Sequence, residues 1–187
     1  RLNYTELRGT AGLVSRIDDP ALAEAGAERI KWYREKMDLV RAFRRRYELE
    51  RPFAGKRLLV CMHCEPKAAV RTEALLAGGA ERIVFVGNLG STKPDTAAYL
   101  AALPDVTVVG RREVTLDDLQ RSVAAAMEES FDLMMDNGAA LMQQYWRQRE
   151  KWKPLGAIEE TRSGRLILDR DGIKPDFPLL VIDDSPV

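Results

Sequence analysis

The sequence has few cysteines and histidines and lacks a long apolar run. Among 187 residues there are two cysteines and one histidine. No apolar run approaches the ~20 residues needed to cross a bilayer, and the first residues lack the basic-then-apolar pattern of a secretion signal. We therefore expect a soluble, cytoplasmic protein.

Neither sign of charge is in excess. Lys and Arg together number 29, as do Asp and Glu, so the formal net charge is zero. A protein without net positive charge has no general electrostatic attraction for nucleic acid or for an anionic membrane. We therefore expect no nucleic-acid or membrane partner, and a small molecule or another protein instead.

The two cysteines lie on either side of the only histidine, in the segment Cys61-Met62-His63-Cys64. Structural zinc normally takes four ligands, and these closely spaced side chains leave only carboxylates to complete a set, so we predict no metal site. We expect Cys61 to be a buried strand residue and Cys64 to lie in a loop. The alternative is a thioredoxin-like arrangement, in which Cys64 opens a helix and has a lowered pKa.

Short apolar runs alternate along the chain with stretches of helical periodicity. Apolar runs without polar alternation are typical of strands covered on both faces of a parallel sheet. We predict such strands at 57–62, 82–86, 106–109 and 131–135. Helices are expected at 66–76, 94–102, 116–130 and 141–152, with one or two more between Asp18 and about Tyr47. This order predicts a doubly wound α/β domain, with a mostly parallel sheet and helices on both faces.

Three other segments have less definite patterns. Residues 1–17 show no clear period, and we expect an irregular arm that packs on the domain or on another subunit. The arginine-rich segment 41–46 is expected to be a solvated helix face, with contact to an acidic partner as the alternative. Tyr145, Trp146 and Trp152 are expected to belong to the core or to a subunit contact.

Polar loops follow two of the predicted strands. In doubly wound sheets, ligands bind outside the carboxyl ends of the strands, where the loops converge. Residues 63–65 follow the first predicted strand and residues 136–138 follow the fourth. Neither Gly-x-Gly-x-x-Gly nor Gly-x-x-x-x-Gly-Lys-Ser/Thr follows any predicted strand. We therefore expect a small-molecule site at these loops, without a phosphate-binding loop of either kind.

A series of short motifs follows in order over roughly residues 18–187. They read D-P-A-L-A-E-A-G from Asp19, R-P-F-A-G-K-R-L from Arg51, C-M-H from Cys61, A-V-R-T-E-A-L and G-G-A-E from Ala69 and Gly78, N-L-G-S-T-K-P-D from Asn88, E-E-T-R-S-G from Glu159, and P-L-L-V-I-D-D-S from Pro178. Together they resemble the amino-terminal, substrate-binding half of the S-adenosylhomocysteine hydrolase family.

The resemblance implies a Rossmann-like domain over 18–187 that binds S-adenosylhomocysteine, adenosine or a related nucleoside thioether. In the family a separate, later domain binds NAD, and the ribose is oxidised and finally reduced again while the thiol leaves and water adds. We expect this chain to lack the NAD domain, to bind no NAD alone, and to hydrolyse its ligand only when such a domain is supplied. A homo-oligomer, or a complex with an NAD-binding subunit or domain, is also implied.

Motif positions carry the family's roles to individual residues. His63 would move a proton near the 5′ side of the substrate, unless it is a loop histidine bound by backbone. Glu160 would accept hydrogen bonds from the ribose hydroxyls, unless it caps a helix. Thr161 and Ser163 belong to the same loop, and Glu65 fits one form of the loop that contacts adenine.

The sequence also departs from the family pattern. The family segment D-D-G-G-D, whose second aspartate acts in acid/base chemistry, has Asn137 in that place. An amide exchanges no proton near neutral pH, and loss of such a step slows turnover by ~10²–10⁴-fold. Lys67 and Ala68 depart in the adenine loop, which leaves another nucleoside-like ligand open. A non-catalytic binding, regulatory or scaffold protein is therefore the second hypothesis.

Overall fold

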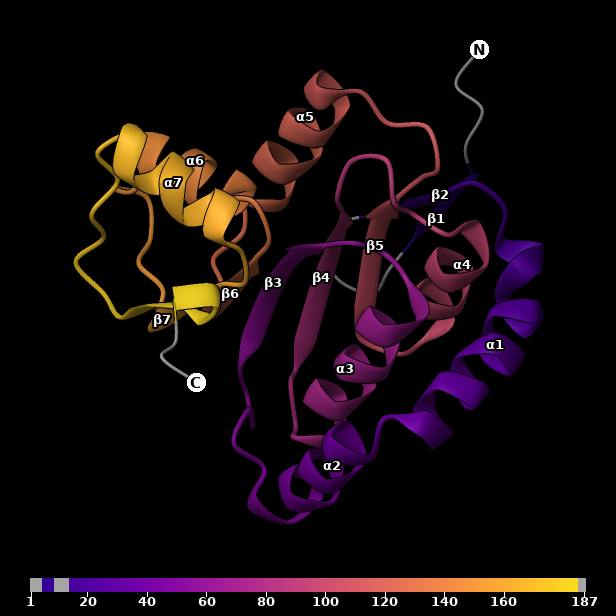
Figure 1. The fold of residues 1–187 in the computed structure, drawn as a ribbon. Helices are drawn as coiled ribbons and strands as arrows, with labels where there is room; N and C mark the ends of the chain where they lie inside the picture. The colour runs from indigo at the N-terminus through magenta and orange to yellow at the C-terminus, as the bar shows by residue number, and fades with distance from the viewer. Residues whose placement is uncertain (1–4, 9–13, 185–187) are drawn as a thin grey trace.

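The computed structural model describes residues 5–8 and 14–184, whose strands form one sheet in the order β1-β2-β5-β4-β3-β6-β7-β8 (Figure 1). Neighbouring strands are parallel except β1 and β2. The strands are β1 (Thr5–Arg8), β2 (Val14–Ile17), β3 (Arg57–Met62), β4 (Arg82–Gly87), β5 (Val106–Gly110), β6 (Leu133–Asp136), β7 (Gly156–Glu159) and β8 (Leu179–Val181). The predicted α/β fold with a mostly parallel sheet is confirmed.

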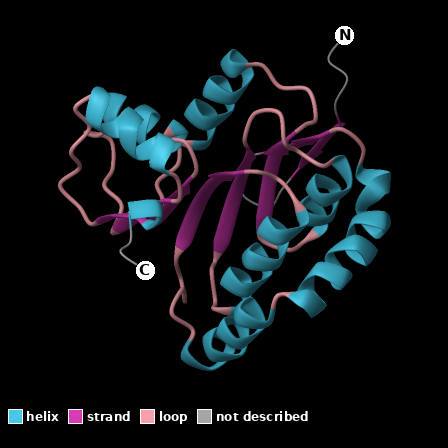
Figure 2. Cartoon of the chain, viewed as in Figure 1, coloured by secondary structure: helices cyan, strands magenta, loops and turns pink. Residues whose placement is uncertain are grey.

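Helices cover both faces of the sheet (Figures 1 and 2). One face carries α1 (Ala23–Lys36), α2 (Asp38–Glu50), α3 (Pro66–Ala77) and α4 (Pro94–Ala102). The other carries α5 (Leu116–Ala126), α6 (Ala140–Arg147) and α7 (Arg162–Arg170). Short 3-10 turns lie at Pro20–Leu22 and Ile182–Asp184. Over the described part of the chain, every helix is too short or too polar to cross a membrane.

Two hydrophobic cores lie on opposite sides of the sheet. Successive side chains of a strand point to opposite faces, so Leu58 and Val60 join the core beneath α1, α3 and α4. Leu59 and Cys61 join the core beneath α5, α6 and α7. Both faces of β3 are therefore buried, which explains why its sequence is a continuous apolar run.

The prediction of an irregular arm at 1–17 is wrong for two segments, because residues 5–8 and 14–17 form β1 and β2. β2 lies beside β5, where Ser15 Oγ accepts a hydrogen bond from the backbone N–H of Val108 at 2.9 Å. Its side chains alternate in burial over only four residues, which is too short a pattern to detect from sequence. The rest of the expected arm, residues 1–4 and 9–13, lies outside the described residues.

Two expected helices end earlier than the sequence predicts. α5 stops at Ala126 rather than residue 130, and α6 stops at Arg147 rather than residue 152. After α6 the chain turns back, so that Trp152 packs edge-on against Phe131 and Tyr145, with ring centroids 6.0 and 5.5 Å apart. The expected core role of these aromatic residues is confirmed by this packing and by Tyr145, which is buried.

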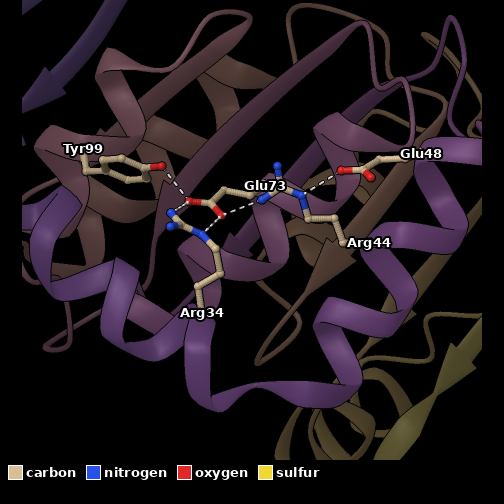
Figure 3. Close-up of polar contacts among 5 residues, drawn as sticks. All are labelled: Arg34, Arg44, Glu48, Glu73 and Tyr99. Atoms are coloured by element: carbon tan, nitrogen blue, oxygen red, sulfur yellow. Dashed lines mark hydrogen bonds and ion pairs between the residues drawn. The ribbon is translucent and has the colours of Figure 1, made fainter.

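A buried carboxylate ties the helices of one face together (Figure 3). Glu73 on α3 accepts two hydrogen bonds from Arg34 on α1, at 2.7 and 2.6 Å, and one from Tyr99 on α4 at 2.6 Å. Arg44 on α2 reaches it at 3.4 Å and also pairs with Glu48 at 3.1 Å. The arginine-rich segment is therefore mainly an exposed helix face, as expected, but one of its arginines also anchors α2 to α3.

Candidate functional site

The order of the strands reverses at the carboxyl edge of the sheet, between β3 and β6, and we call this switch point the crevice because sheets of this kind bind ligands there. The chain passes from β3 to β4 to β5 in one direction and then returns to place β6 on the other side of β3. The loops after β3 and β6 consequently lead to helices on opposite faces, which is where ligands bind in sheets of this kind. Those loops hold His63 and Asn137. The loops in which the sequence predicts a small-molecule site therefore meet at the topological switch point.

A chain of hydrogen bonds begins at His63, after β3. Its Nδ1 lies 2.5 Å from Ser91 Oγ, after β4, and Ser91 Oγ donates to the Asn88 carbonyl at 3.3 Å. While Ser91 donates its proton to that carbonyl, its oxygen is open to a hydrogen bond from Nδ1–H of His63, which leaves Nε2 on the other side of the ring. The histidine is exposed and bound by a side chain, which differs from the alternative of backbone contact.

The chain continues from Asn88 to the far side of the crevice. Asn88 Nδ2 donates to the backbone carbonyl of Asn137 at 2.8 Å, and Asn137 Nδ2 lies 3.4 Å from Glu160 Oε2. The other oxygen of Glu160 forms an ion pair with Arg71 of α3. The Glu160 side chain is 14% exposed, so a charged acceptor with spare lone pairs lies within the crevice.

Glu159, the last residue of β7, is a fully buried carboxylate beneath this loop. It accepts hydrogen bonds from the backbone N–H groups of Gly138 at 3.0 Å, Ala139 at 2.9 Å and Thr161 at 2.8 Å, and from the Thr161 hydroxyl at 2.7 Å. Gly164 lies so close that a Cβ there would meet the Glu159 carboxyl at 2.2 to 2.5 Å. This carboxylate fixes the loop after β6 against the start of α7.

Asp136, the last residue of β6, pairs in register with Glu159 and is also fully buried. It accepts from the backbone N–H groups of Asn137 and Met142, both at 3.0 Å. Burial and then the charge of Glu159 raise the pKa of Asp136 to about 8, against the lowering effect of those N–H groups. Asp136 therefore faces the protein interior, below the exposed end of the crevice.

The remaining predicted residues lie around the crevice in different roles. Thr161, the N-cap of α7, accepts from the Gly164 N–H at 2.9 Å, and Ser163 donates to Thr161 at 3.2 Å. The alternative interpretation, in which Glu160 caps a helix, is therefore wrong, since Thr161 caps α7. Glu65 precedes α3 with an exposed side chain, outside the hydrogen-bonded chain formed by the described residues.

The cysteines take no part in the crevice. Cys61 is buried within β3 and Cys64 is buried in the loop that follows, as predicted. Burial raises the pKa of both thiols, so the thioredoxin-like alternative with a lowered pKa at Cys64 is wrong. Among residues 5–8 and 14–184, no group of three or more His, Cys, Asp or Glu side chains lies together as metal ligands would.

The loops after β3 and β4 do not fit the phosphates of NAD. A dinucleotide needs a close glycine turn and free N–H groups at the start of a helix. Here α3 and α4 each begin with proline, Pro66 and Pro94, which has no N–H. Buried Cys64 fills the turn before α3. These two loops therefore offer no site for the pyrophosphate of NAD.

For three contributors to the crevice, the sequence predicted no individual role. Asn88 and Ser91 lie in the turn after β4, and the rule that selected the loops after β3 and β6 applies equally to that turn. Arg71 gave no such signal, because it lies in the middle of α3 and its partner is 89 positions away.

Comparison with known proteins places this geometry in a family. The sequence model described as S-adenosyl-L-homocysteine hydrolase matches residues 15–169. An adenosylhomocysteinase from Gloeothece citriformis is 32% identical over 98% of this chain and 44% of its own length. An S-inosyl-L-homocysteine hydrolase from Methanopyrus kandleri is 33% identical over 90% of this chain and 41% of its own length. The chain thus spans less than half of these relatives, and it belongs to the S-adenosyl-L-homocysteine hydrolase family.

Proposed function

We propose that the crevice binds the nucleoside part of S-adenosylhomocysteine or of a related thioether nucleoside. The observation that carries the proposal is the continuous hydrogen-bonded chain from His63 through Ser91, Asn88 and Asn137 to Glu160. It brings an imidazole and a carboxylate to the two sides of one switch point. Relatives named for adenosyl and inosyl substrates both match the chain, so both purine nucleosides belong to the proposed ligand class.

In this proposal each residue has a distinct chemical task. Glu160 accepts hydrogen bonds from the ribose hydroxyls, since a carboxylate offers several lone pairs to a diol. His63, through Nε2, takes or returns a proton at the 5′ side. Thr161 and Ser163 act as supports, because their hydroxyls are held within the loop. Glu65 contacts the base from its exposed position before α3.

Hydrolysis of the thioether is proposed only for a complete enzyme in which another domain or subunit supplies NAD. A second candidate function is binding without turnover, and Asn137 favours it. An amide cannot exchange the proton that a carboxylate would, while it still donates toward Glu160. Binding by this chain is common to both candidates, and turnover separates them.

Calorimetric titration with adenosine, S-adenosylhomocysteine and S-inosylhomocysteine tests the proposal. Glu160→Gln should weaken nucleoside binding by ~10–100-fold, because hydrogen bonds to a charged group contribute about 1.5–3 kcal/mol. The matched control is Glu81→Gln, an exposed glutamate outside the crevice, which should leave affinity unchanged. Absence of binding by the unmodified chain, or equal losses in both variants, would refute the proposed site.

A further inference from the structure

Arg71 connects the crevice to the layer of helices that contains α2 and α3. Its side chain leaves the middle of α3 and borders a mainly apolar cavity of about 170 Å³, which Phe43 and Tyr47 of α2 and Met135 of β6 also line. From there the guanidinium reaches Glu160, with which Nη1 forms the ion pair. Arg71 thus extends from a hydrophobic layer to a carboxylate of the crevice.

The backbone and the side chain of Glu160 are held by different partners. Its backbone N–H donates to the Asp136 carbonyl at 2.9 Å, which continues the pairing of β6 with β7. That bond fixes the backbone but leaves the side-chain torsions free. Among the described residues, Arg71 pairs with the carboxylate as its cation, while the Asn137 amide lies at a long 3.4 Å. Arg71 therefore determines the direction in which the carboxylate points.

The other contacts of this arginine are weak. Its Nε is buried and has no hydrogen-bond partner among the described residues. Its Nη2 has the sulfur of Met62 at 3.3 Å, and a thioether is a weak acceptor. A buried donor without a partner lowers stability. The position of Arg71 is therefore better explained by its bond to Glu160 than by the packing of α3.

We propose that Arg71 is a positioning residue for nucleoside binding: by holding Oε1 of Glu160, it directs Oε2 toward the ribose hydroxyls. The inference rests on the proposed function, because it takes Glu160 as the ribose acceptor. Arg71 itself contacts no ligand in this proposal. Its effect is confined to ligands that carry the ribose hydroxyls, which distinguishes positioning from a general effect on folding.

The test compares the affinities of adenosine and 2′,3′-dideoxyadenosine, measured by calorimetry on the whole chain, because their ratio isolates the ribose hydroxyls. Arg71→Met removes the guanidinium and keeps an unbranched side chain beside the apolar cavity. It should reduce the ratio by ~10-fold, within the range of coupling between residues in contact. The affinity for 2′,3′-dideoxyadenosine should stay unchanged. Arg71→Lys keeps the charge without the planar fork and should reduce the ratio less.

Two further variants separate positioning from stability. Arg71→Met added to Glu160→Gln should not reduce the ratio further, because the carboxylate that Arg71 positions is already gone. Arg34→Met breaks another ion pair with α3, to the buried Glu73. It should leave the ratio at the value of the unmodified chain, because that pair lies outside the crevice.

Equal losses of affinity for the two nucleosides in Arg71→Met, an unchanged ratio, or a full further reduction in the double variant would overturn the positioning role and leave the proposed function standing. If circular dichroism shows that Arg71→Met does not fold, Arg71→Lys decides: a reduced ratio supports the role and an unchanged ratio overturns it. An unmodified chain that binds both nucleosides equally, or neither, would overturn the proposed function together with the inference.

Discussion

Arg71 on α3 and Glu160 after β7 form an ion pair across the crevice, although 89 positions separate them in the sequence. The arginine also reaches the sulfur of Met62 from Nη2 at 3.3 Å. Removing it leaves a mostly buried carboxylate without its cation. The ion pair therefore couples the packing of α3 to the charge and orientation of Glu160, the proposed ribose acceptor.

We expect Arg71→Leu to lower the free energy of unfolding by about 1–3 kcal/mol, the cost of leaving a buried hydrogen-bonding group without its partner. Urea denaturation measures this loss. Arg71→Lys should recover part of it, because the charge is kept. Arg46→Leu breaks the exposed pair with Glu50 and should cost clearly less than Arg71→Leu, because water screens an exposed ion pair. A similar loss in both leucine variants would contradict a special role for the crevice pair.

The raised pKa of Asp136 predicts a definite pH dependence of stability. The folded chain holds this proton up to a pKa of about 8, whereas the unfolded chain releases it near its ordinary pKa of about 4. The stability contributed by the group is therefore complete below pH ~4 and is lost as pH rises through the folded pKa. The free energy of unfolding of the wild type, relative to that of Asp136→Asn, should therefore decrease by more than about 1 kcal/mol between pH 5 and 9. Each pH unit between the two pKa values removes up to ~1.4 kcal/mol.

Denaturation midpoints at a series of pH values measure this difference. Asp176→Asn is the control, because Lys153 lowers the pKa of Asp176. Its contribution is present above its unfolded pKa and is lost only as pH falls, so the corresponding difference should stay constant above pH ~5. A wild-type advantage over Asp136→Asn that grows with pH would show that Asp136 is ionised in the folded chain.

Gly164→Ala should destabilise the protein by about 1–3 kcal/mol, the usual cost of forcing extra atoms into a packed site. The new Cβ would lie 2.2 Å from Glu159 Cδ, a carboxyl group held by several donors and therefore unable to move aside. Gly110→Ala is the control, because its Cβ would meet Val108 at an ordinary 3.5 Å. Thermal unfolding compares the two, and equal melting temperatures would contradict the close contact.

The titration of Tyr99 reports on the carboxylate that joins the helices of one face. Burial and then the hydrogen bond to Glu73 raise the pKa of Tyr99 to about 12. Glu73→Gln removes the negative charge, so the pKa should fall, while burial keeps it above its ordinary value. Ultraviolet absorbance measures phenolate formation, and comparison with Tyr99→Phe identifies the part of the signal that comes from Tyr99. Glu48→Gln should leave the titration unchanged, because Glu48 contacts Arg44 and not the tyrosine.

The sequence was most informative where local pattern and burial coincide. The helix predicted at 94–102 has those bounds in α4, and the strand predicted at 57–62 has those bounds in β3. Pro94 begins the helix and Pro104 follows its end, while β3 is an apolar run buried on both faces, so each signal is complete within a few residues. β1 and β2 are stabilised by pairing with each other and with β5, and a four-residue strand contains too little pattern to reveal this.

The crevice also has one part that the sequence predicts and another that it does not. His63, Asn137 and Glu160 were selected from loops and motifs, and hydrogen bonds through Asn88 and Ser91 join their loops. Arg71 could not be found from local pattern, because an arginine within a helix is ordinarily solvated. Its function depends on which strand its helix crosses, and that is a property of the sheet order. Long-range pairing is thus the part of the site that sequence periodicity does not specify.

Glu159 gives the two halves of the crevice a common foundation. Its carboxylate binds the loop that carries Asn137 and the turn that carries Glu160 at the same time. Neither loop is therefore an independent module that could be exchanged alone with one from a relative. A chimera that changes ligand preference would have to transplant residues 136–140 and 159–164 together, since each segment is folded on the other.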